Sequence, residues 1–481
     1  MERGPAQAVL PLVGLAAEKV IRDQHKTRIM HSHKSNLIFQ AVGCPRVESG
    51  PAQAVLPLVG LAADQVIGDQ HKVSTPSGIT DANRPRGTFR PERAAPRYRW
   101  WSGSWFVCLA VILSFALPVF GVEQVSFQRD GRQQYVAGKL LVEDQEGGVL
   151  LLSPDRTLWV IPQEEIIRRD HDDAPYRPLT DTEMTEQLLD ELPDGFHVHD
   201  TAHYLIFYNT SPAYARWCGS LYERLHRGFH NYWNNRGFPL REPEQRLVAL
   251  VFDRRRSFQE YAEPELGESA ASMIGYYNMR TNRVTMYDLT GIDGLRGRRG
   301  RSGTTGAHIN HILSQPAAER TVATIVHEAT HQLAYNSGLQ TRYADNPTWV
   351  SEGIAVFFET PDLGSSRGWR SIGGVHPLYL PKFLRSLATR DDDPLTTLLN
   401  DDARFRDPKT SSQAYADAWA LNYYLLRVRH EDYVEYLQEL ANQKPLVEQD
   451  TKQRIARFRR AFGDDLQRLS RKWLRYMQGV R

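Results

Sequence analysis

The sequence predicts an α+β protein in which a small antiparallel β unit precedes a domain with a mixed sheet and a helical lobe. Residues 122–168 contain short β-branched and apolar runs separated by turn-forming residues. Between Thr180 and Asp288, strand-like runs alternate with apolar residues at helical spacing. After Pro316 the pattern is mainly helical. Together these observations indicate the α+β class.

The composition is that of a soluble globular protein. The chain has 481 residues, 41% hydrophobic and 24% charged, which is enough for two or three domains. These values exclude wholesale disorder and a polytopic membrane protein. The 59 basic residues nearly balance the 57 acidic ones, so no nucleic-acid partner is expected. The 3 cysteines are too few for a disulfide scaffold or a cysteine-rich metal site.

Residues 1–95 differ in character from the rest of the chain. The segment Gly4–Lys26 recurs almost unchanged at Gly50–Lys72, and basic, proline-rich stretches follow. Two copies do not form a solenoid, which needs three or more. We expect this region to be a disordered extension, or to lie upstream of the true start of translation. A pair of short helices that bind a partner is the alternative.

Residues 96–121 have the pattern of an export signal. Two arginines precede the apolar run Trp105–Phe120, and a proline and small residues lie near its end. The run is slightly short for a membrane span of about 20 residues. A signal peptide is therefore expected, with an uncleaved membrane anchor at residues 105–121 as the alternative. In both cases Glu123–Arg481 is expected outside the cytoplasm, in the periplasm, at the cell surface or secreted.

The exported part is expected to begin with a small β domain at residues 122–168. Three of its expected strands are Tyr135–Val142, Gly148–Leu152 and Thr157–Ile161. We expect three or four antiparallel strands in all. Residues 169–200 are expected to form a linker and a short helix at Thr182–Leu192.

The remaining residues, 201–481, are expected to form one larger domain. Its expected strands are His203–Tyr208, Arg246–Phe252 and Arg283–Asp288. Between the first two strands, Pro212–Arg236 forms an amphipathic helix, in which Cys218 packs as a small apolar residue. Gly291–Gly306 is rich in glycine and arginine and is expected to be an exposed loop, with a grip on an acidic partner as the alternative.

One sequence motif is typical of a metal-binding site. The segment Arg320–Ala334 contains H-E-x-x-H, formed by His327, Glu328 and His331. On a helix, residues four apart lie one turn apart on one face, so both imidazoles can bind one zinc ion. The aliphatic residues of the segment fall on the opposite side, which predicts that the histidines face a cleft. Glu328 is about 100° round the helix, where it can reach a metal-bound water without being a ligand.

A third ligand is predicted on the next helix, Trp349–Glu359. Thr348 is expected to cap this helix and Pro361 to end it. Glu352 shares a face with Glu359 on an otherwise apolar helix, and a buried carboxylate needs a partner such as zinc. Gly353 is expected to leave room for the close approach of the other helix, the one that carries H-E-x-x-H.

These two motifs together resemble those of the gluzincin zinc metallopeptidases, the group of aminopeptidase N and thermolysin. The segment W-x-x-E-G-x-A-x-F-x-E follows H-E-x-x-H with a similar gap, and the resemblance covers roughly residues 201–478. It is closer still to an uncharacterised family of exported bacterial domains of unknown function. It implies one zinc ion per chain, held by His327, His331 and Glu352. It also implies Glu328 as general base, and Glu359 as a carboxylate that orients a ligand histidine.

The resemblance extends to a tyrosine and a strand. Tyr415, expected to head the helix Tyr415–Leu426, corresponds to a tyrosine that binds the transition-state oxyanion; a packing role is the alternative. The strand before the zinc helix, with Val284 and Met286, corresponds to an edge strand that pairs with substrate. The G-x-M-E-N segment of the aminopeptidases is missing, because Gly275–Met279 lacks its acid. An endopeptidase is therefore favoured over an aminopeptidase.

The remaining histidines and the C-terminal segment are not expected to bind the metal. Four further histidines are expected to lie in loops or after a helix and to be solvated: His308, His311, His376 and His430. Thr451–Met477 carries apolar residues at helical spacing and is expected to pack over the site as part of the helical lobe.

The sequence thus predicts an exported peptidase that hydrolyses peptide or protein substrates with a zinc-activated water. A non-catalytic exported binding module with a structural or vacant metal site is the alternative. A third reading, an arginine-rich binder of envelope polyanions, depends only on the glycine-rich loop and the C-terminal tail. Membrane contact is expected only through an uncleaved N-terminal anchor, and the sequence gives no oligomeric state.

Overall fold

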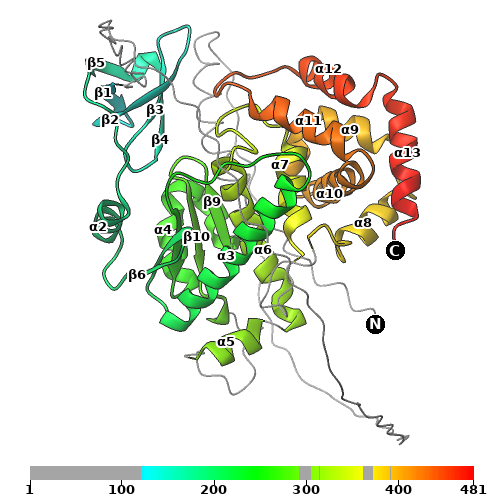
Figure 1. Cartoon of the computed structure of the whole chain (residues 1–481), viewed down its shortest axis with the longest axis horizontal. Helices are drawn as coiled ribbons and strands as arrows, with labels where there is room; N and C mark the ends of the chain where they lie inside the picture. Colours follow the sequence, from blue (N-terminus) through cyan, green and yellow to red (C-terminus); the bar gives the residue numbers. More distant parts are fainter. Residues whose placement is uncertain (1–120, 292–304, 314, 361–371, 391) are drawn as a thin grey trace, which may run out of the picture. The chain divides into compact units, whose positions relative to one another are not determined.

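The computed structural model describes residues 121–291, 305–313, 315–360, 372–390 and 392–481 (Figure 1). The repeats, the export signal and most of the glycine-rich loop lie outside these residues, as does Pro361. The described chain has the predicted mixed architecture of an antiparallel sheet, then a mixed sheet, then a helical region.

The first sheet is antiparallel and has five strands in the order β4-β3-β2-β1-β5. Its strands are β1 (Val122–Arg129), β2 (Arg132–Glu143), β3 (Val149–Leu152), β4 (Leu158–Ile161) and β5 (Ile166–Asp172). Alternate residues such as Val125, Phe127 and Val136 build a core on one face. The prediction of three or four strands, ending at residue 168, is corrected here. The charged strand β5 shows no apolar pattern, because most of its side chains are solvent-exposed.

The second sheet is mixed, with the order β6-β7-β8-β10-β9. Its strands are β6 (His197–Asp200), β7 (Tyr204–Tyr208), β8 (Leu247–Phe252), β9 (Gly275–Asn278) and β10 (Arg283–Tyr287). The three central strands β7, β8 and β10 are parallel, and the two outer strands are antiparallel to their neighbours. Both faces of the central strands are covered, which explains their continuous apolar sequences.

Helices cover both faces of this sheet. Residues Ile206, Ala249 and Met286 share a core with helices α3 (Pro212–Asn234) and α6 (Pro316–Asn336). The alternate residues Phe207, Leu250 and Tyr287 share a second core with α2 (Asp181–Glu191) and α4 (Arg255–Leu266). The predicted boundary at residue 201 is therefore wrong, since α2 and β6, placed in the linker, belong to this sheet domain. Cys218 is buried in α3, as predicted.

The C-terminal part of the described chain is helical, as predicted. Its helices are α7 (Thr348–Phe358), α8 (Tyr379–Ser386), α9 (Pro394–Asn400), α10 (Ser411–Val428), α11 (His430–Ala441), α12 (Thr451–Phe462) and α13 (Leu466–Gln478). The stripe predicted over Thr451–Met477 is divided between α12 and α13 at Gly463, whose φ of 98° ends the first helix. Among the described helices, none has an apolar stretch long enough to cross a membrane.

Candidate metal centre

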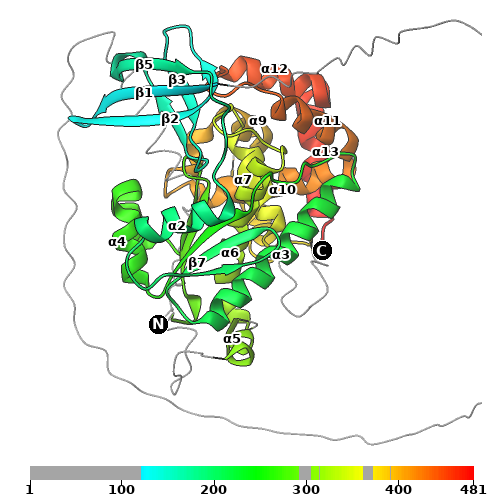
Figure 2. The same cartoon turned by 60° about the vertical axis from the view of Figure 1, so that its left-hand side comes forward.

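The helix that carries H-E-x-x-H packs between the mixed sheet and α7 (Figure 2). Its aliphatic residues are buried as predicted: Val322, Ile325, Val326, Ala329 and Leu333. The Gln332 amide donates to the backbone carbonyls of Val248 and Asn282 at 3.0 and 2.8 Å, which ties α6 to the sheet. Sheet and helix therefore fix the direction in which the two histidines point.

The three predicted metal ligands lie together. His327 Nε2 is 3.1 Å from His331 Nε2 and 3.1 Å from Glu352 Oε2. One nitrogen or oxygen atom from each of the three side chains lies within 4.8 Å of the other two. All three are buried, with exposed fractions of 0, 5 and 3%. Two imidazoles and a carboxylate form a donor set that suits a zinc ion. The residues present therefore fit the implied metal.

The histidine side of α6 is buried as well. Glu328 is 0% exposed, so the side chains of the motif lie deep below the surface. The sequence pattern separated an aliphatic side of α6 from a polar side. It did not show that α7 packs on the polar side of α6, nor that the face of α7 in this contact carries Glu352.

Charge inside this interior favours a cation. Burial lowers the pKa of His327, but hydrogen bonds to Glu352 and Glu359 outweigh that effect and raise it well above its usual value. The pKa of Glu352 lies well below its usual range, because the neighbouring histidines overcome the effect of burial. Both shifts show that positive charge is stabilised beside the two carboxylates.

Glu359 lies behind the ligands, where the resemblance implies it. His327 Nδ1 donates to Glu359 Oε1 at 2.6 Å, which leaves Nε2 for the ligand cluster. On the other side, His376 Nε2 is 3.2 Å from Glu359 Oε2. His376 Nδ1 accepts from the backbone N–H groups of Leu378 and Tyr379, so Nε2 carries the proton and donates to Glu359.

His376 lies in a loop, as predicted, but the expectation that it is solvated is wrong. Its ring is buried at 7% exposure, in contact with Glu359 and Tyr379. No motif marks this residue, because its contact with Glu359 depends on how the chain returns after α7. His308 and His311 lie in the helix α5 (Gly306–Leu313) rather than in loops, and His311 is exposed. His430 begins α11 and is exposed, as predicted.

Glu328 is held at one oxygen only. Its Oε2 accepts a hydrogen bond from the Tyr277 backbone N–H at 2.8 Å. Its buried Oε1 has no hydrogen-bond partner among the described residues. Burial raises the pKa of Glu328 to about 7, against the effect of the nearby histidines. The free oxygen of a carboxyl group with this pKa can take up and release a proton near neutral pH.

Tyr415 lies beside the cluster, although not at the start of its helix. Helix α10 begins at Ser411, so Tyr415 lies within the helix, at 1% exposure. Its ring centroid is 6.3 Å from that of His327. Burial, followed by the neighbouring Glu352 carboxylate, raises its pKa well above the usual value, so the phenol stays protonated. Its hydroxyl has no partner in hydrogen-bonding geometry in the described chain.

Two expectations about neighbouring elements are corrected. Val284 and Met286 lie in β10, which pairs with β8 and β9 and is not an edge strand; the edge strand on this side of the sheet is β9. The sequence pattern did not show which of β9 and β10 lies at the edge, because both strands are short and fully buried. Thr348 is the first residue of α7 rather than its cap, and Pro347 precedes it without a side-chain hydrogen bond.

A further correction concerns the small residue on α7. Gly353 does allow close approach of a helix, but that helix is α10. A Cβ atom at position 353 would lie 2.8 Å from the Ala418 carbonyl oxygen and would overlap the Asn422 amide. The Asn422 amide nitrogen donates to the Trp349 carbonyl at 3.0 Å. The glycine thus sets the distance between α7, which carries Glu352, and α10, which carries Tyr415.

Comparison with known families gives one match. A family model described as a protein of unknown function, DUF1570, matches residues 321–447. The matched range holds the whole cluster, from His327 on α6 to Tyr415 on α10. Its description states no activity. Comparison with curated proteins gives no match.

Proposed function

We propose that the protein is an exported zinc metallopeptidase of the gluzincin type, and an endopeptidase. One observation carries the proposal: His327, His331 and Glu352 bring their donor atoms together beside a carboxyl group, Glu328, that has one free buried oxygen. A purely structural metal site has no use for such a group, because only hydrolysis needs a proton acceptor there. The export signal predicted at residues 96–121 supports a location outside the cytoplasm.

His327, His331 and Glu352 are the residues that would hold the metal. Zinc would supply Lewis acidity there, lowering the pKa of a water molecule to about 7 and polarising the substrate carbonyl group. Glu359 fixes the tautomer of His327 through the bond to Nδ1, so that the Nε2 lone pair faces the other ligands.

Glu328 moves the proton. Its Oε2 is held by the Tyr277 N–H, which leaves Oε1 to accept a proton from the attacking water. The oxygen of that water bonds to the peptide carbon, and the C–N bond then breaks. Glu328 passes the proton to the leaving amine, so the carboxylate is regenerated. The Tyr415 hydroxyl donates a hydrogen bond to the carbonyl oxygen as negative charge develops on it.

Pairing with an extended substrate backbone would fall to the edge strand β9 rather than to β10. Strand β9 belongs to the segment Gly275–Met279, which the resemblance compares with the segment in which aminopeptidases carry an acid for the free amine. The Tyr277 N–H already bonds Glu328, which places this segment at the site. The segment contains no carboxylate, and this supports internal cleavage over removal of N-terminal residues.

The proposal is tested with Glu328→Gln. The amide keeps the shape of the side chain but cannot accept the proton, so peptide hydrolysis should fall by at least about 10²-fold. Zinc content and melting temperature should match those of the wild type. Glu319→Gln, an exposed position on the same helix, is the matched control. The measurements are cleavage of a peptide library, metal analysis and thermal unfolding.

Two outcomes would contradict the proposal. One is a Glu328→Gln variant that cleaves peptides as fast as the wild type. The other is a zinc-loaded, folded wild type that cleaves no member of the library, which would favour the non-catalytic binding module instead.

A further inference from the structure

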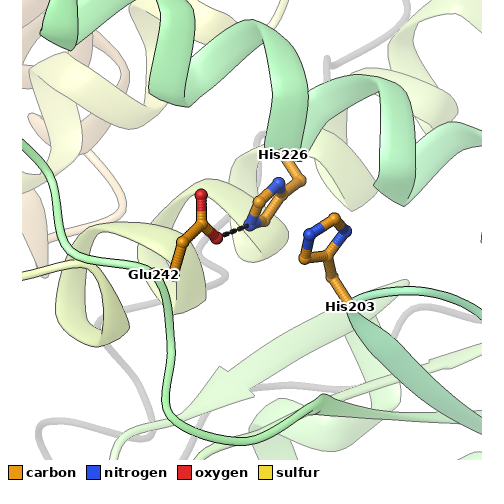
Figure 3. Close-up of side chains that lie close together, drawn as sticks. All are labelled: His203, His226 and Glu242. Carbon is orange, nitrogen blue, oxygen red and sulfur yellow. Dashed lines mark ion pairs between the residues drawn. The ribbon is translucent and has the colours of Figure 1, made fainter.

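A second group of histidines lies on a different part of the sheet domain. His226 and His230 face the same side of α3, one turn apart. His203 lies directly before β7, and Glu242 lies in the loop between α3 and β8. Figure 3 shows the His203 and His226 rings beside each other, with the Glu242 carboxylate directed toward His226. None of these residues takes part in the proposed hydrolysis.

The donor atoms of this group converge. One nitrogen or oxygen atom from each of His203, His226 and Glu242 lies within 4.8 Å of the other two. His226 Nε2 is 3.2 Å from Glu242 Oε2, and His230 Nδ1 is 3.4 Å from Glu242 Oε1. Two ligand atoms on a tetrahedral zinc ion lie about 3.3 Å apart, given bond lengths of about 2.0–2.1 Å. The His226 and Glu242 atoms therefore have the spacing of two atoms that share one ion.

The contact between His226 and Glu242 is not a hydrogen bond. His226 Nε2 is buried and has no partner in hydrogen-bonding geometry in the described chain, although a carboxylate oxygen is 3.2 Å away. The His226 side chain is only 4% exposed, so water does not readily replace the missing partner. A ring nitrogen and a carboxylate oxygen that lie this close without a hydrogen bond are spaced like two ligands of a cation.

The group is also chemically ready for a metal. Burial and the neighbouring imidazoles of His230 and His203 lower the pKa of His226 to about 3, so its ring is neutral at physiological pH. Neutral imidazole is the form that coordinates metals. The His203 and His226 rings stack at 3.8 Å between centroids, and those of His226 and His230 at 4.3 Å.

His203 has the supporting carboxylate that is typical of metal-ligating histidines. Its Nδ1 is 2.7 Å from Glu223 Oε2, and its backbone N–H donates to Glu223 Oε1 at 2.8 Å. The pKa of Glu223 is lowered against the effect of burial by these hydrogen bonds, so the carboxylate accepts and Nδ1 carries the proton. Nε2 of His203 is then the nitrogen with a free lone pair.

An ion can reach the group from solvent. His203 lines a surface cavity together with Arg246 and with Pro243, the residue that follows Glu242 in the chain. The Glu242 side chain is 65% exposed and that of His203 is 38% exposed, so an ion from solvent can approach both. The imidazoles of His226 and His230 on α3 are buried and therefore fixed in position.

We propose that His203, His226 and Glu242 form a second zinc site that stabilises the fold. The bound ion would join the loop before β8 to helix α3 and to the start of β7.

The site is tested in the full chain carrying Glu352→Gln, which disables the first cluster. Zinc added to this protein and then dialysed should remain at about one ion per chain. The additional changes Glu242→Gln and His226→Gln should remove that ion, whereas Glu244→Gln, an exposed glutamate of the same loop, should retain it. Glu223→Gln should weaken zinc binding about 10–100-fold, the typical effect of losing a carboxylate that orients a ligand.

A second measurement, thermal unfolding, needs no substitution at Glu352 or His226, which are both buried. Because Glu242 is exposed, Glu242→Gln should melt at the wild-type temperature in chelator. Added zinc should raise the melting temperature of the wild type more than that of Glu242→Gln. The rise should be equal in the wild type and in Glu244→Gln.

The proposal fails if folded Glu352→Gln protein holds no zinc, or if zinc binding is the same in all cluster variants. It also fails if the zinc-induced rise in melting temperature is equal in wild type and Glu242→Gln. None of these readouts uses peptide cleavage, so this result and that of the Glu328→Gln test are independent.

Discussion

His376 and Glu359 lie behind the candidate ligands and hold them in position. The chain from His376 through Glu359 to His327 consists of charge-assisted hydrogen bonds inside a buried region. Without it, the His327 ring could rotate or take the other tautomer. The ligand geometry therefore depends on two residues that contribute no atom to the cluster of donors.

Replacing Glu359 with Gln tests this dependence. The amide can satisfy only one of the two histidines as an acceptor, so zinc affinity should fall about 10–100-fold with the fold retained. Glu431→Gln, whose side chain is 90% exposed, serves as control. Zinc titration followed by competition with a chelator measures the change. Unaltered affinity in Glu359→Gln would show that His327 is held by packing alone.

Tyr415 offers a test of the proposed oxyanion contact. Its hydroxyl lies near the Glu352 carboxylate but meets no partner in good hydrogen-bonding geometry in the described chain. Because Glu352 keeps its contact with His327, Tyr415→Phe should leave the melting temperature nearly unchanged. Loss of a transition-state donor should lower kcat on the order of 10²–10³-fold.

Tyr433→Phe should show the opposite pattern. The Tyr433 hydroxyl donates to the buried Asn422 Oδ1, so its loss should cost about 1–3 kcal/mol of stability and leave kcat unchanged. Measurement of kcat beside thermal unfolding separates the two tyrosines. A normal kcat in Tyr415→Phe would assign this tyrosine to packing.

Among the elements, α7 and α10 form the contact on which the site depends most. Helix α7 is buried along its whole length, and Trp349 at its start packs against Tyr433, Tyr436 and Phe458. The amide of Asn422 on α10 bonds the Trp349 carbonyl. The close approach at Gly353 therefore places Glu352 and Tyr415 against each other and against α6.

Gly353→Ala should separate these helices. The added methyl group meets the Ala418 carbonyl, which belongs to backbone and cannot turn away, so unfolding free energy should fall by about 1–3 kcal/mol. Zinc affinity should fall too, because Glu352 is the neighbouring residue. Gly479→Ala, where the nearest atom would be 3.4 Å away, should change stability by less than about 0.5 kcal/mol. Denaturant unfolding and zinc titration give both values; a variant as stable as the wild type would contradict this packing role.

At the scale of the whole molecule, the first candidate metal centre brings together segments from two helices. His327 and His331 come from α6, and Glu352 comes from α7, so an ion bound there would link these two helices of the folded state. An ion that binds only the folded state stabilises it by about 2.7 kcal/mol at a free concentration of 100 times its Kd.

Metal removal should therefore lower the melting temperature. The measurement uses Glu242→Gln, which lacks the second proposed site, so that only the first cluster responds. Chelation should lower the melting temperature of this variant, and the further change Glu352→Gln should abolish the response. If the melting temperature of Glu242→Gln is the same with zinc and with chelator, the first cluster does not hold zinc in the folded protein.

The sequence by itself determined those features that depend on local spacing. The H-E-x-x-H turn places His327 and His331 on one helix face whatever surrounds it, and the apolar pattern of 349–359 predicts a buried helix with Glu352 and Glu359 on one side. The continuous apolar runs of β7 and β8 likewise predict buried strands, because the pattern reports burial directly.

Only the tertiary structure decided which segments meet. The contact of His376 with Glu359, the edge position of β9 instead of β10, and the approach of α10 to Gly353 all join residues distant in the chain. The same holds for His203, Glu223, His226 and Glu242, which no motif connects. Local periodicity fixes the face on which a side chain lies. The partner of that face depends on how the sheet and helices pack, because burial and hydrogen bonding are satisfied between elements rather than within them.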